Sequence, residues 1–443
     1  MRRKHVARPN SLVNATQMIW ETAKARKIFR SLSITPWTIV LVASSAFAAL
    51  YIVLALNAFS ALRTDQNTGL YLQSLSNFAH HGTTFDQPDG KPHMAAHNQW
   101  LALLLALPVA VWPFAQTLIV AQVVVLSAAA PVLYFFALGR GASPVIAATI
   151  AVAYLIAPST QGWAYHGFVP EDALPLVAFT LAIAIDRRSL WGTLIAAQIL
   201  LGIKEDECYF AAWIGVFVAT FYDRRAGIAL IMLGTLNGVG YYAIERAYGY
   251  WPERPLYGLH DDDVAHQLAF LVEILAPLAF APLWLGVRIL AIVPFCAELF
   301  LPQQRNFPMY QGGSYYTVPI VTLCTIGATI VLARRPRHAR VALGGAIVMA
   351  LAFNTTVLHV GRSLFSKDPQ FGRAARYADT TIPVDFPCAD VGAWTVAASD
   401  PNARLACPGT AGAGLLPTDL EPGRVPRSAW RDAPLDSRAA WTR

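Results

Sequence analysis

Charged residues are scarce in this chain of 443 residues. Only 14% of the residues are Asp, Glu, Lys or Arg, whereas a soluble domain of this size carries about 25%. Hydrophobic residues make up 55% of the chain, and the mean hydropathy is +0.43. The composition therefore argues against a soluble enzyme, an intrinsically disordered protein and a disulfide-rich scaffold.

Cysteines and nucleotide-binding motifs are also sparse. The chain has five cysteines, no Cys/His spacing typical of a zinc site, no P-loop and no dinucleotide-binding fingerprint. Cys208, Cys296 and Cys324 lie in or beside apolar runs, where a thiol packs as a small hydrophobic side chain. Cys388 and Cys407 lie near the C-terminus, where they either pair in an oxidising compartment or stay free thiols.

Long uncharged runs are what the chain has instead. Residues 37–60 carry no charge, and about 20 apolar residues span the hydrocarbon core of a bilayer. This run is too long, and begins too late, for a cleaved signal peptide, so it predicts a signal-anchor helix. Ten more uncharged runs follow, at about 98–138, 144–159, 173–185, 190–203, 208–222, 226–244, 274–287, 289–297, 317–333 and 341–361.

The run 98–138 decides how the spans alternate. It holds either two spans or one span with a re-entrant or interfacial helix, and Pro108 and Pro113 make it irregular. If it makes one net crossing and the N-terminus is cytoplasmic, the inside segments carry 18 basic and three acidic residues. The outside loops then carry six basic and 13 acidic residues. Because Lys and Arg are enriched in cytoplasmic loops, this count favours an all-α polytopic membrane protein with about 11 net crossings.

This topology predicts three segments. Residues 1–36 form a basic cytoplasmic N-terminal segment, and residues 37–361 form the transmembrane domain, with a long first outer loop at 61–97. Residues 362–443 form an extracytoplasmic tail, which is either partly disordered or a small appendage. The net charge of +7 therefore indicates cytoplasmic membrane loops rather than nucleic-acid binding.

The predicted outer segments contain most of the candidate site residues. The first loop carries Asp65 directly after the first span, where a carboxylate either meets a polar substrate or caps a helix. Between short apolar runs, Lys204-Glu205-Asp206-Glu207 forms either a hydrated turn or a functional cluster of ionisable groups. The other candidates, all substrate-binding, are Arg63, Gln73, His97, His166, Glu171, Asp172, Arg305, Tyr315 and Tyr316.

Alternatives stay open for several of these residues. Glu171 and Asp172 follow Pro170, so they also fit simple capping of a helix N-terminus. The loop 245–267, with His260 and Asp261 to Asp263, fits a divalent-cation site but is more often a solvated acidic loop. The amide and tyrosine side chains at 302–316 are suited to sugar contacts.

The order of several motifs along the chain resembles a bacterial family of membrane proteins, catalogued as domain of unknown function 2079. The resemblance covers about 55–330, and its most specific element is the Lys-Glu-Asp signature after a short apolar run. The motifs are Asp65…Gly69…Gln73, His97 before an apolar run, Phe168…Pro170-Glu171, and Lys204-Glu205-Asp206.

Two departures from the family pattern concern histidines. Phe168-Val169-Pro170 stands where the family has Phe-His-Pro, and Tyr315-Tyr316 stands where it has His-Tyr. If the family histidines bind a metal or the donor phosphate, their replacement bears on whether this member keeps the family's activity. His166 is the nearest histidine that could replace the first of them.

The family is placed near membrane glycosyltransferases of the C-type fold. The resemblance therefore implies a C-type bundle in the bacterial inner membrane that uses a polyprenyl-phosphate-linked sugar and a glycan or lipid acceptor at the outer face. It also implies that Asp65 holds the position of the catalytic carboxylate. No nucleic-acid partner is expected, and membrane lipids surround the protein.

The chemistry of such a transfer gives the candidates their roles. An acceptor hydroxyl needs a general base, for which Asp65 is the candidate, and the lipid-phosphate leaving group needs cations. Lys204, Arg63 and Arg305 are the available outer cations, and Glu205 and Asp206 hold Lys204 or a divalent cation such as Mg²⁺ or Mn²⁺. A transporter or flippase for a polar or lipid-linked substrate, and a non-catalytic membrane scaffold, are the alternatives.

Overall fold

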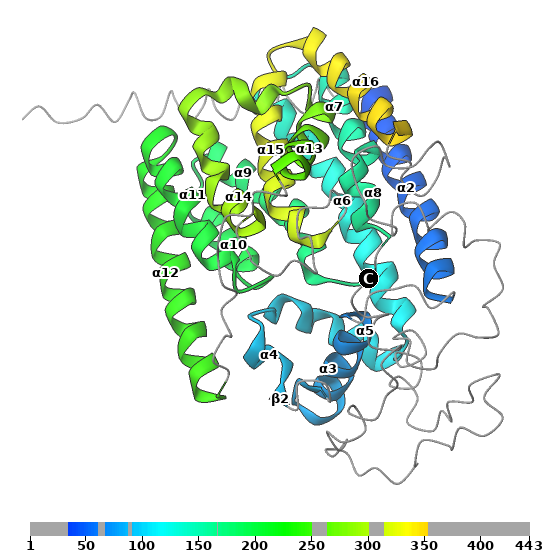
Figure 1. The fold of residues 1–443 in the computed structure, drawn as a ribbon, viewed down its shortest axis with the longest axis vertical. Coiled ribbons are helices and arrows are strands. Elements are labelled where there is room, and N and C mark those ends of the chain that lie inside the picture. The colour runs from blue at the N-terminus through cyan, green and yellow to red at the C-terminus, as the bar shows by residue number, and fades with distance from the viewer. Residues whose placement is uncertain are drawn as a thin grey trace, which may run out of the picture.

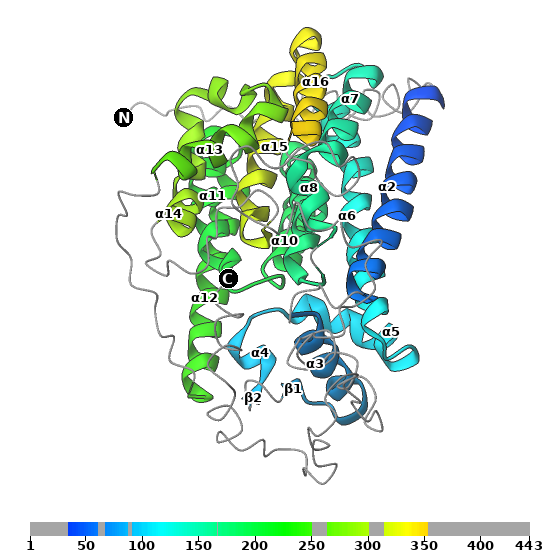
Figure 2. The same ribbon diagram turned by 45° about the vertical axis from the view of Figure 1, so that its right-hand side comes forward.

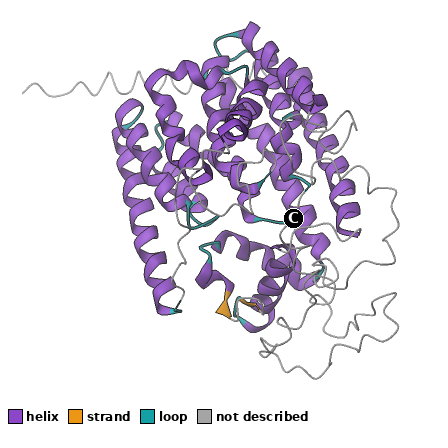
Figure 3. Cartoon of the chain, viewed as in Figure 1, coloured by secondary structure: helices purple, strands orange, loops and turns teal. Residues whose placement is uncertain are grey.

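The protein is a helical bundle with a small layer of short elements at one end (Figure 1). The computed structural model describes residues 34–60, 67–86, 91–165, 167–249, 264–300 and 314–352. The only strands in this part of the chain are the two of a short hairpin in the end layer, each two residues long (Figure 3). Residues 1–33 of the predicted N-terminal segment 1–36, and the whole predicted tail 362–443 with Cys388 and Cys407, lie outside the described residues.

The elements follow one another as helices of very different length. In chain order they are α2 (Ile34–Ser60), α3 (Asn67–His81), β1 (Phe85–Asp86), β2 (Lys91–Pro92), α4 (His93–Ala96), η1 (Trp100–Leu105), α5 (Ala106–Val111), α6 (Ala115–Gly139), α7 (Pro144–Ile156), α8 (Pro158–Trp163), η2 (Pro170–Ala173), α9 (Leu174–Asp186), α10 (Leu190–Leu200), α11 (Glu207–Phe221), α12 (Arg224–Ala247), α13 (Val264–Leu275), η4 (Ala276–Leu278), η5 (Ala281–Ile292), α14 (Val293–Phe300), η6 (Tyr315–Thr317), α15 (Val318–Leu332) and α16 (Pro336–Ala352).

Five helices of the described chain are long and apolar enough to cross a membrane. They are Thr35–Phe59, Ala115–Gly139, Arg224–Ala247, Ala281–Phe300 and Tyr315–Leu332. The outer faces of α2 and α12 are apolar, with Val42, Val53 and Leu236 each more than half exposed. A soluble protein rarely leaves such a surface in water, whereas it is stable against lipid. The fold is therefore that of a helical membrane protein, and the count of 11 crossings stays a prediction.

Polar side chains set several helix starts. The Oγ of Ser143 accepts from the backbone N of Ile146 before α7, and that of Ser189 accepts from Gly192 before α10. The Oδ1 of Asp223 accepts from the backbone N of Arg225 and of Ala226, the second and third residues of α12. These caps satisfy amide groups that have no partner inside the helix, and a short polar residue at each turn therefore begins the next helix.

The bundle is built around α6. The largest fully buried side chains include Tyr134 and Leu133 on α6, Trp163 on α8 and Phe179 on α9. Helices α11 and α12 form a close antiparallel pair in which Gly227 is required, because a Cβ there would lie 2.2 Å from the backbone N of Ala219. Small residues at such contacts let two helix backbones approach closely.

The segment after α2 is not an open loop. We expected a loop over 61–97, but residues 67–81 form α3, and the hairpin pairs Phe85 with Pro92 and Asp86 with Lys91. Thr68, Tyr71, Leu72 and Leu75 share the buried face of α3, which is the spacing of a helix that packs on one side. With α4 and α5, this segment forms the layer below the bundle (Figure 2).

The run 98–138 contains one long helix preceded by short ones. Helix α6 begins at Ala115. The short helices η1 and α5 precede it and lie along the end of the bundle. Leu107 and Trp112 are 76% and 63% exposed, as in a helix that buries its apolar face at the membrane surface. This arrangement agrees with the alternative of one span and an interfacial helix.

Polar contacts connect α6 to its neighbours near both ends of the bundle. Arg140, at the end of α6, pairs with Asp186 at the end of α9. Nearer the other end of the bundle, Gln122, two turns into α6, accepts a hydrogen bond from the backbone N of Val169, the residue before η2. At 1.5 Å per residue, the 18 residues from Gln122 to Arg140 extend about 27 Å, which is close to the ~30 Å hydrocarbon core.

Candidate functional site

Lys204 is the centre of a half-buried charged cluster at the α3 end of the bundle. Its Nζ lies 2.8 Å from Oδ2 of Asp206 and 3.7 Å from Oε1 of Glu171. The same ammonium lies 4.9 Å from the centre of the Tyr316 ring. The turn between α10 and α11 supplies Lys204 and Asp206, η2 supplies Glu171 and η6 supplies Tyr316, so three distant parts of the chain meet here.

Glu205 faces the end layer instead. Its Oε1 lies 3.0 Å from Nδ1 of His97, and its Oε2 accepts a hydrogen bond of 3.2 Å from the backbone N of Asn98. The Asn98 amide in turn donates to the carbonyl of Leu201, and the backbone N of Leu101 donates to that of Gly202. The turn 201–206 therefore joins the layer to the bundle through side chains and backbone together.

Burial and charge move the pKa values of the cluster in opposite directions. Burial raises the pKa of Glu171, and the nearby Lys204 only partly offsets this. Burial would also raise the pKa of Asp206, but the contact with Lys204 outweighs it and lowers the value. Burial would lower the pKa of Lys204, but the carboxylates of Asp206 and Glu171 raise it well above its usual value. The cluster therefore combines a lysine ion pair with Glu171, an acid whose pKa burial holds above its ordinary value.

The pKa of His97 is raised above its ordinary value. Burial would lower its pKa, but the charge of Glu205 and the hydrogen bond to it outweigh burial and raise the value. The ring of His97 lies 5.1 Å from that of His93, which in turn meets the ring of Tyr71 edge-on. The histidine pair thus extends the cluster into the end layer.

Sequence reasoning missed several side chains around this cluster. Tyr71 donates a hydrogen bond of 2.7 Å to Gln99, and its ring lies 5.2 Å from that of Phe168. Tyr209 donates a 2.7 Å hydrogen bond to Asp206, and Glu298 contributes to the pKa shift of the same carboxyl. The helical spacing of 68, 71, 72 and 75 was the signal that could have identified Tyr71.

Asp172 faces away from Lys204. With Gln122, Phe168 and Leu105 it lines a largely apolar cavity of ≈ 500 Å³ between η1, α6, α9 and α10. Burial, and then the charge of Glu171, raise the pKa of Asp172 well above its usual value. Consecutive acids of one turn thus serve different environments, since Glu171 contacts the charged cluster and Asp172 the apolar cavity.

The remaining predicted residues divide into placed and undescribed ones. Gln73 is half-buried on α3, apart from the contacts given above. The ring centres of Tyr315 and Tyr316 lie 4.2 Å apart, with the rings tilted by 32°. Within the described ranges, no group of three or more His, Cys, Asp or Glu side chains is arranged to hold a metal ion. The positions outside those ranges are Arg63, Asp65, His166, Arg305 and the His260 to Asp263 cluster.

The fold and the apolar surface define this chain as a helical membrane protein. Residues 58–244 match the model of a family described as Predicted membrane protein (DUF2079), which confirms the family resemblance over this part of the chain. The match includes His97, Glu171 and the turn at Lys204, and ends before Tyr315 and Tyr316. No curated protein and no solved structure matches the chain.

Proposed function

We propose that this protein is a membrane glycosyltransferase that takes a sugar from a polyprenyl-phosphate donor at the outer face of the bacterial inner membrane. The observation that carries the proposal is the division between Glu171 and Asp172. Glu171 lies 3.7 Å from the ammonium of Lys204, whereas Asp172 lines the apolar cavity of ≈ 500 Å³. A donor with a charged phosphate and a hydrocarbon chain needs such neighbouring polar and apolar surfaces.

Electrostatics of the cluster suit the phosphate of such a donor. When the acceptor hydroxyl attacks the anomeric carbon, the bond from that carbon to the phosphate oxygen breaks and the phosphate keeps the electron pair. Lys204 stabilises this charge, and protonation of Glu171, whose pKa is raised, removes a competing negative charge. Asp65 takes the hydroxyl proton as general base.

Glu205 and Asp206 act on the reaction by holding other groups. Asp206 orients Lys204 through its 2.8 Å contact, and Glu205, 3.0 Å from Nδ1 of His97, favours the protonated form of that ring. Any Mg²⁺ or Mn²⁺ would have to recruit ligands beyond the residues described above. Under this proposal, the remaining candidate residues keep the substrate-binding roles that were predicted for them from the sequence.

Glycosyl transfer by the purified protein tests the proposal. Proteoliposomes would be supplied with radiolabelled hexoses on a short polyprenyl phosphate and with lipid extract as acceptor. Asp65→Asn and Lys204→Ala should each abolish transfer, whereas Asp186→Asn, which changes an ion pair at the other end of α9, should retain it. Undiminished transfer by both of the first two variants, correctly inserted, would refute the proposal.

A transporter or flippase is the second candidate, and the adjacent buried acids favour it. Glu171 and Asp172 are only 4% and 1% exposed, and the pKa of each is raised by burial. Buried acids that exchange protons are a common part of coupled transport. Uptake of the labelled donor into proteoliposomes, unaffected by Asp65→Asn and without any sugar transfer, would support this candidate.

A further inference from the structure

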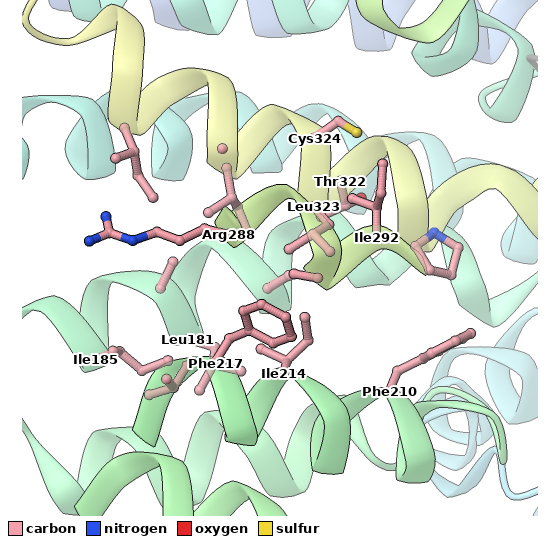
Figure 4. A pocket seen from close by; sticks show the side chains of 18 of the residues that line it. Leu181, Ile185, Phe210, Ile214, Phe217, Arg288, Ile292, Thr322, Leu323 and Cys324 are labelled. Atoms are coloured by element: carbon pink, nitrogen blue, oxygen red, sulfur yellow. The ribbon is translucent and has the colours of Figure 1, made fainter. Parts of the chain in front are cut away.

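A second cavity extends along α11, from Glu207 beside the Lys204 cluster to Arg288 toward the other end of the bundle. It is apolar, has a volume of ≈ 180 Å³ and runs between α9, α11, η5 and α15. Figure 4 shows Phe210 at one end and Arg288 at the other, with Ile214 and Phe217 below and Leu323 above. From Phe210 in α11 to Tyr222, the residue after this helix, the 12 rises extend about 18 Å, which exceeds the ~15 Å of one leaflet's hydrocarbon.

Arginines gather around a single tyrosine at the Arg288 end. The guanidinium carbons of Arg140 and Arg288 lie 5.6 and 5.3 Å from the centre of the Tyr222 ring. All three residues line the cavity. Apolar walls that end in two guanidinium groups match a molecule with a hydrocarbon chain and an anionic head.

Both arginines have N–H groups available to bind an anion. Asp186 pairs with Arg140, but the Nε of Arg140 is buried without an acceptor among the residues that the structure describes. No carboxylate within the described ranges forms an ion pair with Arg288. A buried donor without an acceptor is costly, and guanidinium groups bind phosphate oxygens in pairs. The positive-inside count also predicts that this end faces the cytoplasm, where anionic headgroups attract basic side chains.

We propose that this cavity binds an anionic phospholipid, with its phosphate on Arg140 and Arg288 and one acyl chain along α11. The proposal is independent of the glycosyltransferase function. Since an acyl chain is surrounded by apolar groups both in the cavity and in the bilayer, the chain contributes little to selectivity. The two arginines must therefore select the lipid by its charge.

Lipid retention tests the proposal with two probes that share their acyl chains, phosphatidylglycerol and phosphatidylcholine. Native mass spectrometry of the full chain, titrated with each lipid in detergent, gives the two dissociation constants. We expect at least about tenfold tighter binding of phosphatidylglycerol, and loss of most of that ratio in Arg288→Gln. Arg335→Gln is the matched control, because Arg335 is exposed, lies 4.7 Å from the Trp284 ring and does not line the cavity.

Two more measurements separate the headgroup from the chain. Ala182→Phe should fill the cavity and weaken both lipids, and inorganic phosphate alone should not raise the thermal unfolding temperature. Equal affinities for the two lipids, or equal effects of Arg288→Gln and Arg335→Gln, would overturn the proposal. Stabilisation by inorganic phosphate alone would overturn it in favour of a free-anion site. Unfolding temperatures of the variants show whether each has folded.

Discussion

Replacing Lys204 by methionine should destabilise the protein strongly. The ammonium lies 2.8 Å from Asp206 and 3.7 Å from Glu171. At an effective dielectric constant of about 20, these contacts correspond to about 6 and about 4.5 kcal/mol of attraction. Dehydration of the lysine cancels several kcal/mol of this. The net loss expected for removing one partner of a buried ion pair is about 3–5 kcal/mol, because the carboxylates stay buried without a counter-ion.

The destabilisation should depend on pH with a defined sign. Burial raises the pKa of Glu171 in the folded state, and loss of Lys204 raises it further. A raised pKa in the folded state favours folding with the proton bound, so the variant loses stability as pH rises from about 4.3 through the folded pKa. The difference in stability between wild type and Lys204→Met should therefore grow as pH rises above the ordinary glutamate value of 4.5 and shrink as pH falls toward it.

Unfolding by a denaturing detergent, followed by tryptophan fluorescence, measures this free energy at each pH. Lys204→Arg, which keeps the charge, should lose less than Lys204→Met. Arg335→Met, an exposed cation at the other end of the bundle, should change stability by less than about 0.5 kcal/mol. A loss below about 1 kcal/mol for Lys204→Met at pH 7, or a loss independent of pH, would refute the reasoning.

Three further predictions follow from individual contacts. Since Glu205 raises the pKa of His97 above 6.5, the stability from this pair should be present below pH 6.5 and disappear as pH rises through the folded pKa. An NMR titration of His97 in wild type and in Glu205→Gln measures this pKa shift. Equal pKa values in the two proteins would contradict the prediction. Gly227→Ala should destabilise by about 1–3 kcal/mol, because its Cβ would meet the α11 backbone, whereas Gly240→Ala, with nothing within 4 Å, should not; unfolding curves of the two variants decide. Gly202→Ala should place a Cβ 2.2 Å from the Trp100 ring and loosen the end layer. We expect faster amide hydrogen exchange in residues 91–111 and unchanged exchange in the core. Unchanged exchange in residues 91–111 would count against this contact.

Much of the bundle was predictable because lipid imposes a simple rule on sequence. Every helix that faces hydrocarbon must be apolar over much of its length, so uncharged runs identify α2, α6, α12 and α15 directly. The caps at Ser189 and Asp223 were found only in the structure, although short polar residues before an apolar run are typical N-caps. Short polar-containing helices were harder, and α3 was taken for a loop because its apolar residues occupy only one face.

Part of the candidate site was predictable for a similar reason. Charged residues are costly in a membrane bundle, so Glu171 and the Lys204 turn stood out from their apolar surroundings, and the structure brings them together with His97 through Glu205. The partner of each acid was not predictable. Nothing in the order of the residues shows that Asp206 holds Lys204 while its neighbour Glu205 turns to His97, because that choice depends on how η2 and the end layer pack.

The amino-acid sequence alone determined that the chain is an apolar helical membrane protein whose few charges are unevenly distributed between its loops. Hydrophobicity and charge act residue by residue, so they can be read without knowing the fold. Only the tertiary structure decided that Glu171 faces Lys204 and Asp172 an apolar cavity, and that Arg140 and Arg288 meet at Tyr222. These contacts join residues far apart in the chain, and the packing of whole helices sets their geometry.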